Sequence, residues 1–330
     1  MHIRIENYTD IPIDELNSFL DKNLYASIFQ YPIFFRALSE TEGYKPCLII
    51  SRNSNGVING SLLFYEEKLL GFYGFYISRN VVIGGPVSDD ISLIDELISS
   101  YPNYVSQNTI FTEIRNHRQI DKNQLTNSNF LFKDHLNYYI DLNRSIDEIW
   151  QSFKGEVRTN VRKSNKNNVQ LGVINCKDEL IESYKLLEKN YKKLRIPLPK
   201  LELFLNLFNI LGHKHLKIIV AKYNSKIVGT AIRLHSNNMM TAWYTAIDYE
   251  YKKLKIQDAM NWYSIQLAKK NNLMMFDFGG AGKPDQEYGP RKYKAKFNGD
   301  LKNNGRIYYY HHPLLMKVIE NGYKFKKKII

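Results

Sequence analysis

An apolar hairpin pattern occurs twice in this 330-residue chain, and it constrains the fold more than any other feature of the sequence. The first copy runs from residues 48–50 (Leu-Ile-Ile) to residues 60–63 (Gly-Ser-Leu-Leu). The second copy runs from residues 218–220 (Ile-Ile-Val) to residues 229–232 (Gly-Thr-Ala-Ile), about 169 residues further on. Solenoid repeats recur every ~20–50 residues, so a spacing this long predicts two copies of one α/β unit.

Helices and strands are predicted in the same order around both copies. In each half, helices come first, an antiparallel hairpin follows, and a further helix leads into a buried strand. The helices are expected near residues 13–20, 32–43, 91–99, 178–194, 201–211 and 255–271, and the strands near 3–5, 47–50, 57–65, 69–77, 81–87, 109–114, 216–223, 227–235, 239–248 and 273–278. This order is similar to that of an acetyltransferase-like (GNAT) unit.

The expected fold class is therefore α/β (α+β), with two tandem GNAT-like domains whose mixed sheets are flanked by helices. The first domain is expected to comprise residues 1–140 together with about 308–330. The second, strongly basic domain is expected to comprise residues 141–307.

The composition is that of a globular protein. Apolar residues make up 44% of the chain and charged residues 24%, which excludes a disordered or fibrous chain. Two cysteines, Cys47 and Cys176, are too few for a disulfide scaffold or a cysteine-built zinc site. The first residues lack the apolar core of a signal peptide, and no run of ~18 apolar residues predicts a transmembrane helix. We therefore expect a soluble, reduced protein of the cytoplasm.

The net charge of +13 is distributed unevenly along the chain. Residues 1–140 carry 11 basic and 16 acidic side chains, whereas residues 141–330 carry 35 basic and 17 acidic ones. A field of this sign attracts an anion: a nucleic acid, a phosphate-bearing substrate or an acidic membrane surface. A general abundance of solvated lysines is the alternative explanation.

The sequence contains no cofactor motif, and we predict neither a cofactor nor a metal. The two close histidine pairs have no Cys, Asp or Glu at metal-ligand spacing. The glycine-rich run at residues 279–282 is followed by Pro284, which disfavours the helix that a dinucleotide loop requires. An acyl-CoA transferase holds the donor pyrophosphate on a glycine-rich turn and the next helix N-terminus. The corresponding turn here, residues 249–258, has no glycine, so we expect a donor other than coenzyme A.

Two basic segments are candidates for binding an anion. In residues 150–166, Arg158 and Arg162 are four residues apart and share one face of a predicted helix; a solvated helix rim is the alternative. In residues 288–299, lysines alternate with apolar or aromatic residues, which predicts an extended segment. The lysines of this segment are Lys292, Lys294 and Lys296. They would face phosphates from one side, whereas the alternative is an edge strand with its polar face in solvent.

Four motifs, spread over nearly the whole chain, carry a resemblance to a known family. They are Gln30-Tyr31-Pro32 with Gly43-Tyr44; Gly84-Gly85-Pro86-Val87; Trp150 with Arg158-Thr159-Asn160-Val161-Arg162-Lys163-Ser164 and Val169; and Phe276-Asp277-Phe278-Gly279-Gly280 with Tyr293-Lys294 and Phe297-Asn298-Gly299. The last is the most specific, because it joins an aspartate–aromatic–glycine strand end to an aromatic–lysine pair and a final glycine. Together the motifs resemble the Fem family of aminoacyl-tRNA-dependent transferases (FemA, FemB and FemX), which build peptidoglycan cross-bridges.

This resemblance implies an aminoacyltransferase. An amine of a peptidoglycan precursor, carried on a lipid or on a uridine nucleotide, would attack the ester carbonyl of an aminoacyl-tRNA and release the tRNA. Tyr293 and Lys294 match the family's aromatic–lysine pair and are the expected catalytic residues. Lys294 would hold the terminal phosphate or stabilise developing charge on the ester oxygen. The residues expected to bind substrate are Arg36, Lys200, Arg158, Arg162, Lys292, Lys296, Asp277, Gly279 and Gly280.

The chain departs from the family pattern at several places. Phe34 stands near the position of a family tryptophan, and Tyr293 replaces the phenylalanine of the aromatic–lysine pair. The inserted helical arm of the longer members is absent, so the shorter FemX-type architecture fits better. A C-terminal helix near residues 313–327 would pack back on the first domain. The basic tail at residues 324–330 would make a peripheral contact with the inner membrane surface, or it is a solvated helix end, which we favour.

Two alternative functions stay open. One is a GNAT-type N-acyltransferase that uses acyl-CoA or an acyl carrier protein to acylate an amino sugar or another amine. The glycine-free turn disfavours coenzyme A but not a carrier protein. The other is a non-catalytic protein that binds nucleic acid or another anion.

Overall fold

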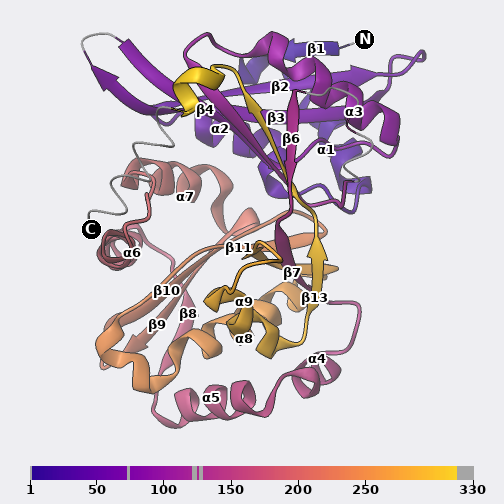
Figure 1. Cartoon of the computed structure of the whole chain (residues 1–330). Coiled ribbons are helices and arrows are strands. Elements are labelled where there is room, and N and C mark those ends of the chain that lie inside the picture. Colours follow the sequence, from indigo (N-terminus) through magenta and orange to yellow (C-terminus); the bar gives the residue numbers. More distant parts are fainter. Residues whose placement is uncertain (1, 73–74, 121–124, 126–128, 318–330) are drawn as a thin grey trace. The chain divides into compact units, whose positions relative to one another are not determined.

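The computed structural model describes residues 2–72, 75–120, 125 and 129–317. The chain divides into two compact units, one formed by Met1–Asp134 with Asn304–Ile330 and the other by His135–Asn303. Each unit contains one seven-stranded mixed sheet with helices packed against it (Figure 1), which confirms the fold class that the repeat predicts.

The first sheet has the strand order β1-β2-β3-β4-β5-β14-β6. Neighbouring strands are antiparallel except β4 and β5, which run parallel because helix α3 forms the crossover between them. The elements of this unit are β1 (His2–Ile5), α1 (Ile13–Lys22), α2 (Pro32–Ser39), β2 (Tyr44–Arg52), β3 (Ile58–Phe72), β4 (Phe75–Gly84), α3 (Ile91–Ser100), β5 (Thr109–Asn116), β6 (Phe130–Lys133) and β14 (Arg306–Tyr310).

The second sheet has the strand order β13-β7-β12-β11-β10-β9-β8. Its one parallel pair is β11 with β12, and helix α8 forms the crossover. The elements are β7 (Leu136–Asp141), α4 (Ile146–Ser152), α5 (Gly155–Lys166), β8 (Gln170–Val173), α6 (Lys177–Leu194), α7 (Leu201–His215), β9 (Leu216–Tyr223), β10 (Lys226–His235), β11 (Met239–Ile247), α8 (Ile256–Lys270), β12 (Met275–Gly282), α9 (Gly289–Lys294) and β13 (Asp300–Asn303).

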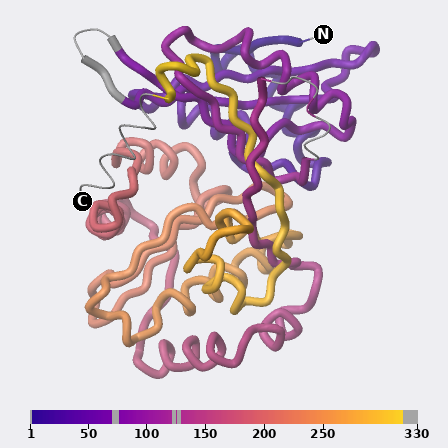
Figure 2. The backbone as a smooth tube through the Cα atoms, viewed as in Figure 1, coloured from indigo at the N-terminus to yellow at the C-terminus, as the bar shows by residue number. Residues whose placement is uncertain are grey.

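The two sheets share one topology over five strands and differ in where their sixth strand comes from. Strands β1 to β5 correspond in order and direction to β8 to β12, but the next strand in each sheet comes from a distant part of the chain: β14 lies beside β5, and β7 beside β12. Figure 2 shows β14, in yellow, returning to the strands of the first unit. The domain boundaries that the sequence predicted near residues 140 and 308 therefore fall inside strands β7 and β14. Local sequence pattern does not show which sheet a strand joins, because that depends on the strands with which it pairs.

Gly60 and Gly229 occupy the same place in the two hairpins, where a helix crosses the sheet closely. A Cβ atom at Gly60 would lie 2.9 Å from Leu93 Cδ2 of α3, and one at Gly229 would lie 2.7 Å from Ile256 Cγ2 of α8. Real Cβ atoms do not approach heavy atoms so closely, so any larger residue would force the Leu93 or Ile256 side chain to shift. The glycine repeated in the sequence therefore marks a repeated packing contact.

We expect Gly229→Ala to destabilise the protein by about 1–3 kcal/mol, because the added methyl group overpacks the contact with α8. Combining it with Ile256→Ala, which removes the opposing methyl group, should recover part of that loss. Urea denaturation of the wild type, both single variants and the double variant measures the coupling. If the stability loss of the double variant equalled the sum of the two single losses, the predicted contact between Gly229 and Ile256 would be wrong.

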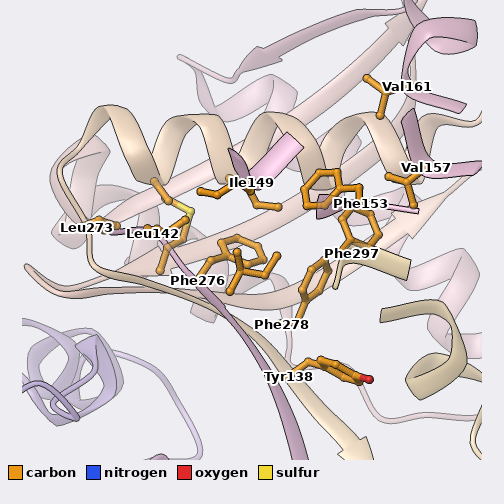
Figure 3. Packing of buried hydrophobic residues seen from close by; sticks show 14 of the residues in the cluster. Tyr138, Leu142, Ile149, Phe153, Val157, Val161, Leu273, Phe276, Phe278 and Phe297 are labelled. Carbon is orange, nitrogen blue, oxygen red and sulfur yellow. The ribbon is translucent and has the colours of Figure 1, made fainter. Parts of the chain in front are cut away.

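The core of the second unit is an aromatic cluster that joins α4, α5, β12 and the turn after α9. Phe153, Phe278 and Phe297 are buried and lie together in this cluster (Figure 3). The ring centroid of Phe297 is 5.1 Å from that of Phe153 and 5.0 Å from that of Phe278. The cluster therefore anchors the chain just after α9 against the sheet.

The C-terminal predictions fall largely beyond the described residues, which end at residue 317. Residues 313–317 are helical, but the remainder of the predicted helix at 313–327 and the whole basic tail at 324–330 lie outside them. Within the described ranges, the structure contains no helix that is both long and apolar enough to cross a membrane.

Candidate active site

Strands β11 and β12 separate after a short parallel pairing, and the second unit opens between them. They pair over three residues, from Met239 opposite Met275 to Thr241 opposite Asp277. In the first unit the corresponding strands β4 and β5 stay paired as far as Gly84. The opening is therefore a feature of the second unit and not of the repeated topology.

A β-bulge in β11 accompanies this separation. Ile232 of β10 faces Tyr244, whereas the next residue, Arg233, faces Ala242, so Trp243 is the extra residue on β11. Beyond the paired residues lies a cavity of about 600 Å³, here called the splay pocket. It is lined by Tyr191, Arg233, Ala242, Trp243, Thr245, Gln257, Asn261, Phe278, Gly279, Gly280, Tyr288, Gly289, Pro290, Tyr293 and Lys294.

Lys294 is the amine of the splay pocket. Its side chain is largely buried, and Nζ donates a hydrogen bond to the carbonyl oxygen of Gly280 at 2.7 Å. Burial lowers the pKa of Lys294 to about 8; the nearby Asp277 carboxylate opposes this shift and Arg233 adds to it. Asp277 is itself buried and accepts a hydrogen bond from the backbone N–H of Gly279 at 2.7 Å. The pocket thus holds an ammonium group that can lose its proton near neutral pH.

Tyr293 ties α9 to α8 through a buried hydrogen-bond chain. Its hydroxyl donates to Asp258 Oδ1 at 2.6 Å and accepts from Asn261 Nδ2 at 2.9 Å. Asn160 of α5 donates to the other oxygen of Asp258 at 2.6 Å. Burial, and then the adjacent Asp258 charge, raises the pKa of Tyr293 well above its usual value. Tyr293 therefore stays neutral, and its hydrogen bonds fasten the part of α9 that carries Lys294 to α8.

We expect Tyr293→Phe to lower the free energy of unfolding by about 1–3 kcal/mol, because the buried Asp258 carboxylate loses a donor. Tyr308→Phe is the matched control in the first unit, where the Tyr308 hydroxyl donates to the buried Glu113 at 3.0 Å. Both losses can be measured by urea denaturation. Only Tyr293→Phe should also change the pH dependence of transfer, because only Tyr293 adjoins Lys294.

Arg233 adds a second cation to the pocket. It is fully buried and donates to neutral acceptors, among them Ser264 Oγ at 3.0 Å and Asn261 Oδ1 at 2.9 Å. Burial lowers the pKa of Arg233 to about 10, which still leaves it charged at neutral pH. Among the described residues, the acceptors to which Arg233 donates are hydroxyl, amide and backbone oxygens, so its charge contributes a positive potential that favours an anionic group in the pocket.

The structure brings part of the predicted site together. Tyr293, Lys294, Gly279 and Gly280 all line the splay pocket, and Asp277 lies directly behind it. These residues come from the most specific of the four sequence motifs. The aspartate–aromatic–glycine segment and the aromatic–lysine pair therefore form one site through the end of β12 and α9.

The predicted extended lysine row at residues 288–299 is wrong. The segment forms α9 and then a 3₁₀ turn (Ala295–Phe297), with Pro290 in the first turn of the helix. Because the spacing is helical, Lys292 and Lys296 point away from the pocket. They form surface ion pairs at 2.8 Å with Glu287 and Glu156, respectively.

The other predicted cations lie outside the splay pocket. Arg158 donates to the backbone oxygens of Gln151 and Phe153, and the Arg162 guanidinium lies 5.8 Å from the ring centroid of Trp150. Lys200 is exposed at the start of α7. Arg36 belongs to the first unit and pairs with Glu40 at 2.8 Å. A role for these four residues in substrate binding stays a prediction.

The turn before α8 offers no glycine-rich cradle for a pyrophosphate. Tyr249–Leu254 forms a 3₁₀ turn, and Lys255 adopts a left-handed conformation before the helix begins at Ile256. The first turn of α8 also contains the buried carboxylate of Asp258. A negative charge in this turn disfavours a second anion at the helix N-terminus.

Three residues of the site were not anticipated from the sequence: Arg233, Asp258 and Asn261. Arg233 carried a usable signal, because it is the single charged residue in the mainly apolar run 227–234 of a predicted strand. Asp258 and Asn261 are ordinary polar residues of a helix, and only the packing of α9 against α8 reveals their contacts. Among the described residues, no group of three His, Cys, Asp or Glu side chains is arranged to hold a metal ion.

Comparison with known proteins agrees with this architecture. Residues 151–295, which include every residue that lines the splay pocket, match the model of the acetyltransferase (GNAT) domain. The fold is also that of the crystal structure of FemX, at 14% identity and a TM-score of 0.73, over 96% of this chain and 100% of that one.

Two further solved structures share the fold. The C-terminal domain of a putative lysylphosphatidylglycerol synthetase from Agrobacterium fabrum matches at 10% identity and a TM-score of 0.58, over 94% of this chain and 95% of that one. A tandem GNAT protein from the clavulanic acid biosynthesis pathway matches at 8% identity and a TM-score of 0.52, over 94% of this chain and 98% of that one. No curated protein sequence matches the chain significantly.

Fold and domain match together support an acyltransferase of the GNAT type. Within that class the chain has the Fem-like tandem architecture that the sequence motifs predict. Such an enzyme requires an acyl or aminoacyl donor and an amine acceptor.

Proposed function

We propose that the protein transfers an amino acid from aminoacyl-tRNA to an amine of a peptidoglycan precursor, in the cytoplasm. The observation that carries this proposal is the content of the splay pocket. Two cations, the buried Arg233 and the largely buried Lys294, line a GNAT-type opening whose neighbouring turn has no glycine for a pyrophosphate. Such a pocket suits the phosphate and ester end of an aminoacyl-tRNA better than coenzyme A.

The chemistry would be a substitution at the ester carbonyl. The acceptor nitrogen forms a bond to the carbonyl carbon, and the bond between that carbon and the ribose oxygen breaks. The attacking amine supplies the proton that the leaving ribose oxygen takes up, so the step needs no cofactor. In its charged form, which dominates below about pH 8, Lys294 would hold the terminal phosphate or stabilise the developing oxyanion.

The charge distribution supports an RNA donor. Residues 141–330 carry 35 basic and 17 acidic side chains, and phosphate neutralisation supplies most sequence-independent affinity for nucleic acid. The resemblance to the Fem family and the full-length similarity to FemX favour a peptidoglycan precursor as acceptor. The acceptor would be linked to a lipid or to a nucleotide.

A filter assay with tRNA charged with a labelled amino acid tests the proposal. We expect transfer of label to a nucleotide-linked or lipid-linked precursor, and we expect RNase treatment of the donor to abolish it. Efficient transfer from acyl-CoA, or retention of charged tRNA without transfer to either acceptor, would contradict the proposed reaction. Each acceptor is assayed separately, so that the result tests the identity of the donor and the identity of the acceptor independently.

The domain match favours a second candidate function. Residues 151–295 match an acetyltransferase model, and the fold also occurs in a tandem GNAT protein. An N-acyltransferase that takes its acyl group from a carrier protein agrees with the glycine-free turn and with the basic second unit. Label transfer from an acyl carrier protein, but not from charged tRNA, would establish this alternative.

A further inference from the structure

The first unit contains a second cavity, of about 650 Å³, which the proposed transfer does not use. It lies against the face of the first sheet that α3 also covers, where β2 begins, and residues 104–107 close its other side. All of its lining residues fall between positions 4 and 107. We call it the β2 pocket.

Two buried hydrogen-bond acceptors form the floor of the β2 pocket. Glu66 of β3 and Asn80 of β4 face each other across the strands, and their side chains are only 8% and 1% exposed. Oε1 of Glu66 accepts a hydrogen bond from Ser78 Oγ at 2.6 Å. Asn80 donates a long hydrogen bond, 3.4 Å, to the Tyr101 hydroxyl, but its Oδ1 has no partner among the described residues.

An orphaned amide oxygen beside a buried carboxylate is costly for a folded protein. Burying a polar group without a hydrogen bond costs about 1–3 kcal/mol, and a carboxylate adds to that cost unless a donor neutralises it. Both residues line the cavity, but Asn80 Oδ1 itself has almost no accessible surface, so Glu66 is the acceptor that a ligand would meet. A buried carboxylate at the floor favours a donor-rich and preferably positive group, such as a primary ammonium.

The mouth of the same cavity has the opposite polarity. Lys45 lies beside Glu66 across the strands, and its exposed ammonium donates to the Tyr76 hydroxyl at 3.1 Å. Arg4 also lines the cavity; it pairs with Glu6 at 2.5 Å and lies 5.9 Å from the ring centroid of Tyr104. The carboxylate of Glu6 lines the cavity as well and compensates Arg4, so Lys45 is the main cation at the mouth. The Glu66 acceptor at the floor and this cation at the mouth match a molecule that is positive at one end and negative at the other.

We propose that the β2 pocket binds a free α-amino acid. Its ammonium would bond to Glu66, and its carboxylate would face Lys45. A phosphate ligand would meet the Glu66 carboxylate, and a neutral sugar would leave the Lys45 ammonium unused. The walls include the rings of Phe64 and Tyr104, and the volume lies within the usual range of small-molecule sites, so an apolar side chain fits.

Thermal unfolding of the full-length protein with single L-amino acids at millimolar concentration tests this proposal. At about ten times its dissociation constant, the cognate amino acid should raise the melting midpoint by about 2–4 °C. Its N-acetyl derivative lacks the ammonium and its amide lacks the carboxylate, so neither should produce the shift. The proposal would be overturned if no amino acid raised the melting midpoint, or if the N-acetyl derivative raised it equally.

Variants locate the binding site. Glu66→Gln keeps the shape of the side chain and should abolish the shift, and Lys45→Met, at the exposed mouth, should weaken it. Lys294→Met is the matched control and should leave it unchanged, since Lys294 lies in the splay pocket of the second unit. If the amino acid still raised the melting midpoint of Glu66→Gln but not that of Lys294→Met, it would bind in the splay pocket instead.

Cys47 supplies an independent measurement that does not depend on the stability of those variants. Its thiol is 5% exposed and lines the β2 pocket, whereas the other cysteine, Cys176, is exposed. In a Cys176→Ser background, a saturating cognate amino acid should slow alkylation of Cys47 by a small thiol reagent about tenfold. An unchanged rate at a concentration that shifts the melting midpoint would show that binding occurs elsewhere. The result is independent of the proposed transfer, because the assay requires neither tRNA nor acceptor.

Discussion

Replacing Lys294 by methionine is expected to lower kcat/KM for transfer by about 10²–10³-fold, the effect of removing one preorganised charge from a developing oxyanion. Methionine is unbranched and only one heavy atom shorter than lysine, so it keeps most of the packing in the pocket. Only the ammonium group and its hydrogen bond to the Gly280 carbonyl are lost. The loss should therefore appear in catalysis and not in folding.

The stability of Lys294→Met should stay equal to that of the wild type or exceed it at pH 7. Burial lowers the pKa of Lys294 from 10.5 to about 8. Holding the buried charge below pH 8 therefore costs the folded state about 3 kcal/mol, partly offset by the hydrogen bond. Between pH 8 and 10.5 the unfolded chain binds more protons than the folded one, so wild-type stability rises with pH in this range relative to the variant.

Urea denaturation at pH 7 and pH 10, together with transfer kinetics, measures both effects. In the wild type, kcat/KM should fall as the pH rises through about 8, because the ammonium loses its proton. Lys292→Met is the matched control: Lys292 is exposed and paired with Glu287, so its loss should change neither property appreciably. Wild-type activity in Lys294→Met would remove Lys294 from the reaction.

Phe297→Ala is expected to cost about 3–5 kcal/mol of folding free energy. The Phe297 ring is fully buried, and its centroid lies within 5.7 Å of those of Phe153, Phe278 and Tyr293. Truncation leaves a cavity among rings that cannot collapse into it. Because Tyr293 packs on the same ring, the cavity also loosens the residue that positions Lys294.

Urea denaturation of Phe297→Ala and Phe297→Leu measures how much of the lost free energy of unfolding comes from the cavity and how much from any substitution at this position. The leucine variant refills most of the volume and should lose clearly less stability. Transfer should fall in the alanine variant even at a temperature where it stays folded. A loss below about 1 kcal/mol in Phe297→Ala would show that the aromatic cluster does not anchor this turn.

The sequence predicted the repeated architecture because that information is local. Each hairpin is an apolar run of a few residues, and Gly60 and Gly229 stand at matching places where a helix crosses a strand. Local pattern failed at residues 288–299, where alternation of lysine with apolar residues predicted a strand. There, Pro290 lies in the first turn of a helix, and the i, i+4 contact of Tyr293 with Phe297 fits helical spacing.

The candidate site was predicted in part. The motif residues Asp277, Gly279, Gly280, Tyr293 and Lys294 come together as the sequence motifs imply. The other cations that were chosen by residue type line no part of the splay pocket. Residue type shows that a charge is present, but burial and pairing decide whether it faces a pocket or the solvent.

By itself, the sequence determined the two α/β units and the basic second half, and it singled out Lys294 as a candidate, because periodicity, composition and motifs are properties of short stretches of chain. Only the tertiary structure decided that β11 parts from β12, that β7 and β14 join sheets remote in sequence, and that Arg233 is buried beside Lys294. Strand pairing and desolvation depend on residues tens to hundreds of positions apart. The lowered pKa of Lys294 results from its burial in the folded protein and cannot be read from the lysine itself.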